Sequence, residues 1–189
     1  GLTPVDPQQP YDVRELIEDV AAELEPLLRD SIAKQQLAMR FQPIYDLRTR
    51  SYWGCEGLLR WDHPQKGLME CRHFIDLACQ TGLVVGLGNW VFQNLPSLGD
   101  QLPKNTKVSL NCSVSELLQA DFARKLTKMM ESIRSLRPDC FVIELREDDL
   151  LDENPALFEV VKGLRRWNVS VAVDDFNGRA PLQRLQELK

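Results

Sequence analysis

Five oxygen-bearing side chains each follow a short apolar run, a pattern that could bind a cation. They are Glu56, Asn111, Glu144, Asp174 and Asp175. Such runs predict strands that are buried on both faces. Because a carboxylate is costly to bury without a partner or a metal ion, strand-end acids need an explanation. If parallel strands bring all five to one rim, they form a site of oxygen ligands for a hard divalent cation, suited to a phosphate-like substrate.

Each of these residues also has a purely structural interpretation. Glu56 could pair with Arg60, Asn111 could cap the following turn, and the two aspartates could cap a helix. Taken alone, the cap is the better interpretation of Asn111, and the evidence for the others is balanced. Several such residues at successive strand ends together favour metal binding.

Alternating strands and helices position these residues. Apolar patterns predict strands over residues 37–44, 52–61, 107–110, 140–145 and 169–173. Helices are predicted over residues 72–81, 87–98 and 181–188, and from Asp121 and Asn154 onward. The first two strands can pair as a hairpin, and the alternation that follows predicts a parallel sheet covered by helices. Since five strands cannot close an eight-stranded barrel, we expect either a fragment or an edge covered by another chain or segment.

The N-terminal region, residues 1–26, is predicted to be separate from the rest of the chain. Residues 1–26 are predicted to form a linker and a helix, which could be the end of an upstream domain. Asp12 and Glu15 match a capping box at the helix start, and Pro26 is predicted to break the helix and start a second one.

The composition limits the classes of partner. The chain has 189 residues and a net charge of −5, with no basic stripe suited to duplex nucleic acid. No run is long and apolar enough to span a bilayer, so we expect no membrane contact by this segment. Five cysteines without a CxxC pair predict a reducing, cytoplasmic setting. The lack of a histidine cluster argues against zinc.

Several motifs resemble those of the EAL domain family, in the same order along the chain. The segment Cys55 to Trp61 resembles the family signature, and Phe41 to Ile44 resembles its opening strand. Further on, residues 111–113 match its N-x-S element, residues 144–147 its E-x-T-E element, and residues 174–176 the start of its DDFGTG loop. Arg146 stands where that family has threonine.

The resemblance implies a fold and an activity. The fold is an α/β, TIM-barrel-like EAL fold with mostly parallel strands and one antiparallel strand. About five of the eight strands would be present, so residues 27–189 would be the N-terminal part of an EAL domain. The family hydrolyses cyclic di-GMP to linear pGpG with Mg²⁺ or Mn²⁺.

It also implies roles for individual residues. The metal ligands would be Glu56, Asn111, Glu144 and Asp174, with Asp175 at a second ion. The residues that contact the dinucleotide would be Gln42, Leu58 and Arg60. Glu147 would anchor the loop after the fifth strand, which in this family couples substrate and metal binding to dimerisation. A homodimer and an upstream GGDEF or sensor domain are further expectations.

Three departures from the family pattern qualify these expectations. Gly57 replaces the alanine of the signature, with little expected effect beyond backbone freedom. Residues 176–181 lack the GTG run of the loop and are one residue short. The family's lysine, later glutamate and glutamine would lie beyond Lys189, so we expect hydrolysis only in a complete parent protein. The alternative is an inactive EAL-like module that binds cyclic di-GMP or a protein partner.

Overall fold

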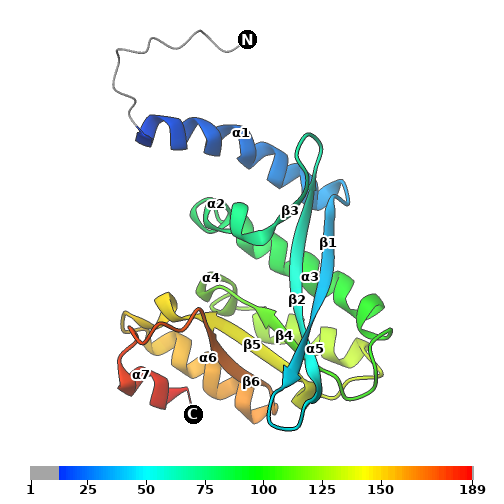
Figure 1. The fold of residues 1–189 in the computed structure, drawn as a ribbon. Helices are drawn as coiled ribbons and strands as arrows, with labels where there is room; N and C mark the ends of the chain where they lie inside the picture. Colours follow the sequence, from blue (N-terminus) through cyan, green and yellow to red (C-terminus); the bar gives the residue numbers. More distant parts are fainter. Residues whose placement is uncertain (1–12, 189) are drawn as a thin grey trace.

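The computed structural model describes residues 13–188, which fold around one six-stranded sheet (Figure 1). The strands are β1 (Leu37–Asp46), β2 (Ser51–His63), β3 (Gly67–Glu70), β4 (Lys107–Asn111), β5 (Phe141–Arg146) and β6 (Ser170–Asp174). Their order in the sheet is β1-β2-β4-β5-β6, and β3 pairs with β2 outside this path. The predicted α/β class is confirmed.

The long strand β2 connects the two kinds of pairing in the sheet. It pairs antiparallel with β1 and β3, and parallel with β4. The β4–β5 and β5–β6 pairs are also parallel. The mostly parallel sheet and its antiparallel hairpin were therefore predicted correctly, but β3 was missed. With only four residues, β3 is too short to show a period-two pattern.

Over the described residues, seven α-helices precede, connect and follow the strands. They are α1 (Val13–Ala33), α2 (Ile75–Gln80), α3 (Leu83–Gly99), α4 (Val114–Leu117), α5 (Phe122–Ser132), α6 (Pro155–Arg166) and α7 (Leu182–Glu187). Short 3₁₀ helices lie at Cys71–His73, Pro138–Cys140 and Glu147–Leu150. Within residues 13–188, no helix is both long and apolar enough to cross a membrane.

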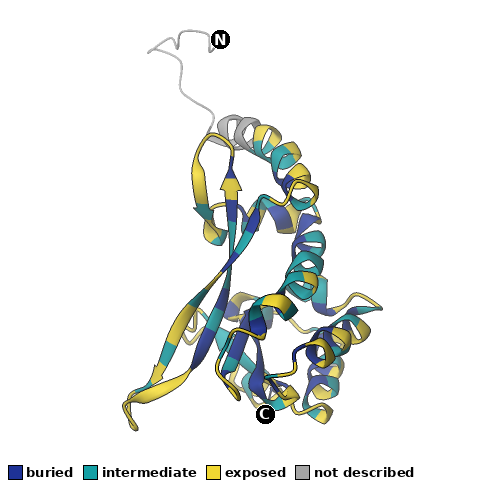
Figure 2. Ribbon diagram, turned by 90° about the vertical axis from the view of Figure 1, so that its right-hand side faces the viewer, coloured by how far each residue is buried: buried dark blue, intermediate teal, exposed yellow. Residues whose placement is uncertain are grey.

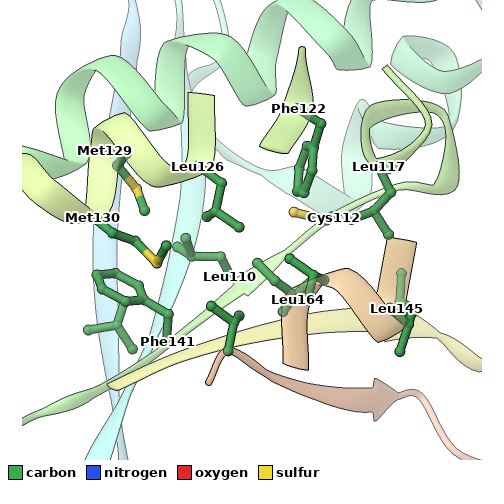
Figure 3. Close-up of a cluster of buried hydrophobic side chains, with 14 of the residues drawn as sticks. Leu110, Cys112, Leu117, Phe122, Leu126, Met129, Met130, Phe141, Leu145 and Leu164 are labelled. Carbon is green, nitrogen blue, oxygen red and sulfur yellow. The ribbon is translucent and has the colours of Figure 1, made fainter. Parts of the chain in front are cut away.

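The larger hydrophobic core lies between the parallel strands and the helices α5 and α6. Leu126 of α5, Leu110 of β4 and Leu164 of α6 are among the side chains that meet there (Figure 3). Burial of such side chains stabilises the fold by about 1.5–3 kcal/mol each. The tip of the β1–β2 hairpin lies outside this core, where Tyr45 and Leu47 are 60% and 89% exposed (Figure 2).

A second cluster joins α1, α2 and the start of α3 to the hairpin. Leu28 and Trp61 are fully buried at its centre. The predicted helix break at Pro26 is wrong, because α1 continues through this residue. Pro26 is exposed, so its ring faces solvent while Leu27 and Leu28 keep the helix packed. The predicted linker over residues 1–10 and the cap at Asp12 lie outside the described residues.

Two glycines on β2 differ in what surrounds them. A Cβ atom at Gly54 would lie 2.3 Å from the backbone oxygen of Lys107, on the neighbouring strand β4. A Cβ atom at Gly57 would lie 2.8 Å from Cε of Met39 and 2.9 Å from Cδ2 of Leu110. Side-chain ends can move aside, whereas a paired backbone cannot. Gly54 is therefore required by the β2–β4 pairing, and Gly57 is not.

These surroundings predict opposite tolerance to the same substitution. We expect Gly54→Ala to lower the free energy of unfolding by about 3 kcal/mol or more, because it separates β2 from β4. Gly57→Ala should change this energy by less than about 1.5 kcal/mol, because Met39 and Leu110 can repack. Urea denaturation of the two variants measures the difference. Equal losses would contradict the assignment of the close backbone approach to Gly54 alone.

Candidate functional site

One pocket of about 410 Å³ lies between the carboxyl ends of the parallel strands and the helices α2 and α3. All five predicted metal ligands line it: Glu56, Asn111, Glu144, Asp174 and Asp175. The opposite wall is apolar and includes Val84, Leu87 and Val91 of α3. The pocket thus joins a polar rim to a surface that could accommodate a flat, apolar part of a ligand.

The strand register brings the ligand candidates to this rim. Asn111 of β4 is paired with Glu144 of β5, so both occupy the same level of the sheet. Glu56 of β2 is paired with Ser109, which lies two residues before Asn111 on β4. At this separation, Nδ2 of Asn111 donates a 2.7 Å hydrogen bond to Oε1 of Glu56. Three neighbouring strands therefore contribute polar groups to one patch.

The carboxylates of this patch influence one another. Burial, together with the nearby charges of Glu56 and Asp174, raises the pKa of Glu144 above its ordinary value of 4.5. Carboxylates that repel each other in a partly buried site are stabilised by a bound cation. The donor set of carboxylate and amide oxygens fits Mg²⁺ or Mn²⁺ rather than zinc.

The acids surround the pocket without forming a closed metal cage. Over residues 13–188, no three Asp, Glu, His or Cys side chains converge in the way that metal ligands do. The side chain of Asn111 links β4 to β2, because its amide nitrogen donates a hydrogen bond to Glu56. Its amide oxygen is the atom that would face a cation.

The structure excludes the cap interpretations of these residues. Ser113, not Asn111, caps α4, and its side chain forms a capping box with Glu116. Oε2 of Glu116 accepts hydrogen bonds of 2.9 Å and 2.7 Å from the backbone N and Oγ of Ser113. The cap position of α7 is Pro181, so the aspartate pair caps no helix there. Glu116 lines the pocket but was not predicted, although its S-x-x-E spacing is a known cap signature.

The alternative pairing of Glu56 with Arg60 is also wrong. Four residues along a strand span about 13 Å, which separates the two side chains. Nη1 of Arg60 instead donates to the carbonyl oxygen of Leu59 at 3.0 Å. Of the three residues predicted to contact the dinucleotide, Leu58 lines the pocket, whereas Gln42 and Arg60 do not. Gln42 lies on β1 opposite Glu56 and is exposed.

Glu147 is completely buried and is bonded to the loop that follows β6. Its Oε1 atom accepts hydrogen bonds from the backbone N–H groups of Arg179 at 2.6 Å and Ala180 at 2.9 Å. Its Oε2 atom accepts a third, from the N–H group of Asn177 at 2.6 Å. Burial opposes ionisation, but these three donors outweigh it and lower the pKa of Glu147 below its ordinary value of 4.5. One carboxylate thus holds the loop that carries Asp175 at its start.

Comparison with known proteins identifies the family. Residues 27–189 match the EAL domain family. The chain belongs to this family. It is 31% identical over 172 residues to the cyclic di-GMP phosphodiesterase NbdA of Pseudomonas aeruginosa. This match covers 88% of this chain and 22% of NbdA. It is 29% identical over 150 residues to the cyclic di-GMP phosphodiesterase PdeL of Escherichia coli. This match covers 77% of this chain and 41% of PdeL.

A solved structure supports the same assignment. The PaMucR phosphodiesterase, in complex with c-di-GMP, matches with a TM-score of 0.77 at 26% identity. The match covers 87% of this chain and 68% of the PaMucR chain. This EAL domain therefore spans well under half of its relatives NbdA and PdeL.

The bonds of Glu147 predict a pH-dependent contribution to stability. Glu147→Gln keeps the size of the side chain but turns an amide NH₂ toward backbone donors, so we expect the Tm to fall by at least about 3 °C at pH 7. Because the folded pKa is lowered, the carboxylate stabilises the protein fully above pH 4.5 and less as the pH falls below it. The Tm difference between wild type and variant should therefore narrow on acidification, as measured by thermal denaturation from pH 7 to pH 3.

A neighbouring acid provides the control. Asp148 pairs with Nη2 of Arg179 at 2.6 Å, but both side chains are about half exposed. Asp148→Asn should therefore lower the Tm by less than about 2 °C. A loss as large as that of Glu147→Gln would show that charge, rather than the buried hydrogen bonds, holds the loop.

Proposed function

We propose that this EAL domain belongs to a phosphodiesterase that hydrolyses cyclic di-GMP to linear pGpG with Mg²⁺ or Mn²⁺. The observation that carries the proposal is the placement of Glu56, Asn111, Glu144, Asp174 and Asp175 around one pocket. The relatives NbdA and PdeL are named as cyclic di-GMP phosphodiesterases, which supports this substrate.

The reaction requires an activated water and a way to neutralise phosphate charge. Water adds to one phosphodiester, and the bond from phosphorus to the leaving ribose oxygen breaks. A bound divalent ion would supply both an acidified water and charge neutralisation. Glu56, Asn111, Glu144 and Asp174 would hold this ion, and Asp175 would serve a second one.

The chain's own groups would bind and orient the dinucleotide. Leu58 lies on the pocket wall and would contact it directly. Gln42 and Arg60 would have to turn toward the pocket, which for Arg60 means leaving the carbonyl oxygen of Leu59. An arginine suits this role because its planar fork can donate two hydrogen bonds to a phosphate.

The loop anchored by Glu147 favours turnover over an inactive module. The loop lacks the GTG run, yet it still closes on Glu147 through three backbone hydrogen bonds. A held loop keeps Asp175 at the pocket, where it is needed. We propose that the same loop couples ligand binding to a homodimer, and that a GGDEF or sensor domain precedes this one.

We also propose a cytoplasmic setting. All five cysteines, at positions 55, 71, 79, 112 and 140, are free thiols. Cys55, Cys112 and Cys140 are buried in the core and act as small apolar side chains. Free thiols are typical of a reducing compartment.

The complete protein should convert cyclic di-GMP to pGpG in Mn²⁺, as followed by chromatography of the products. Glu56→Gln removes one ligand charge and should lower kcat/KM by about 100-fold or more. Glu131→Gln, on the exposed face of α5, is the matched control and should leave turnover unchanged. If cyclic di-GMP bound tightly in calorimetry and no pGpG formed, the domain would be a binding module instead.

Removing the ion should abolish turnover and lower stability. Excess EDTA should stop pGpG formation, and added Mn²⁺ should restore it. An ion that binds only the folded state raises the Tm by mass action, so Mn²⁺ should stabilise the wild type and not Glu56→Gln. This readout does not depend on activity. An equal rise in both proteins would show that Glu56 is not a ligand.

A further inference from the structure

The pocket has far more negative than positive charge. Its lining contains seven carboxylates, Glu56, Asp76, Glu116, Glu144, Asp149, Asp174 and Asp175, but only two arginines, Arg72 and Arg146. A dinucleotide with two phosphodiesters would be repelled by such a surface unless cations compensate. Bound divalent ions would neutralise the acids at the sheet, which leaves the rest of the ligand to be held by other groups of the pocket.

Arg146 lies on the same face of the sheet as the metal-ligand candidates. It follows Glu144 by two residues on β5, and side chains at this spacing point to the same side of a strand. It is paired in register with Asp174 of β6. Arg146 therefore lies one step beyond Glu144, toward the open rim, and its side chain is 48% exposed.

The present contacts of Arg146 are weak. Nη1 lies 3.4 Å from Oδ1 of Asp76 on α2, and Nη2 lies 3.5 Å from Oδ2 of Asp148. The Asp76 side chain is 75% exposed, and that of Asp148 is 43% exposed. Long, exposed ion pairs of this kind contribute little to stability. The guanidinium can therefore exchange either carboxylate for a phosphate at small cost.

We propose that Arg146 binds a phosphate of the dinucleotide and is a determinant of substrate affinity in this domain. The proposal rests on the proposed function of the pocket. The guanidinium of Arg146 carries five donors in a fork that matches a phosphate. It already bridges the pocket from β5 to α2. Arg60, which the family resemblance assigns to the phosphate, does not line the pocket in this structure.

Arg72 is a matched control, because it is the other cation of the pocket lining. It is paired with Glu70 at 3.1 Å, and its side chain is 74% exposed. Arg72→Gln and Arg146→Gln remove the same charge from the same pocket. If the two arginines act only through their charge, both variants should weaken ligand binding equally. If Arg146 contacts the ligand directly, only Arg146→Gln should weaken it.

Asp76→Asn separates a phosphate contact from a structural ion pair. It breaks the same pair as Arg146→Gln but leaves the guanidinium in place. If Arg146 binds phosphate, Asp76→Asn should leave binding unchanged or tighten it, because a competing carboxylate has been removed. If the β5–α2 bridge itself matters, both variants should weaken binding to the same extent.

The test uses the complete protein and cyclic di-GMP. KM and kcat are measured with Mn²⁺, which would compensate the acids of the pocket, and the dissociation constant is measured by calorimetry with EDTA present, where no turnover consumes the ligand. Arg146→Gln should raise KM, and the dissociation constant where binding is measurable, by roughly 10–100-fold. Arg146→Lys should recover part of this loss, since it keeps the charge but not the fork. Arg72→Gln should change the same constants by less than about threefold.

Several outcomes would overturn the proposal. Wild-type affinity in Arg146→Gln, with hydrolysis intact, would refute the contact and leave the proposed function standing. Equal losses in Arg146→Gln and Arg72→Gln, or in Arg146→Gln and Asp76→Asn, would refute it as well. A wild-type protein that neither binds nor hydrolyses cyclic di-GMP would overturn both. If Arg146→Gln does not fold, Arg146→Lys and Asp76→Asn provide the same comparison.

Discussion

The parallel register of β2, β4, β5 and β6 is the constraint on which this domain depends. Parallel strands run toward the same edge of a sheet, so each can contribute a polar group to a common rim. Asn111 and Asp174 are the last residues of β4 and β6, whereas β2 continues beyond Glu56 to His63, so the prediction that Glu56 ends its strand is wrong. The offset of Glu56 from Asn111 is fixed by the backbone ladder, and a hydrogen bond of 2.7 Å shows that it is short enough for contact. Gly54 permits the close approach of β2 to β4, and so supports the same offset.

The buried carboxylate of Glu147 holds the loop that follows β6 beside this rim. Glu147 is buried yet ionised, because three backbone donors replace the water that it loses. The chain can thus depart from the family's loop sequence and still hold the loop, since the bonds involve backbone atoms rather than side chains. At the rim the balance is the opposite, because burial and the charges of Glu56 and Asp174 raise the pKa of Glu144.

Sequence patterns predicted the sheet and the five polar residues at its rim, four acids and Asn111, because apolar runs ending in a polar residue report burial directly. They did not predict β3, which is too short to be periodic, or the continuity of α1, where packing of Leu27 and Leu28 overrides the effect of Pro26. They also did not predict the ion pair of Arg146 with Asp76. These residues lie 70 positions apart, and only the tertiary fold brings them together.

The uninterrupted course of α1 has a mechanical consequence. Its C-terminal half is fixed in the cluster around Trp61, five residues after Glu56 on the same strand. A continuous helix places its first turns and this cluster on one element, although Pro26 leaves one backbone carbonyl without its usual helical donor. A displacement of the first turns would therefore reach β2 through the packing of Leu28 against Trp61.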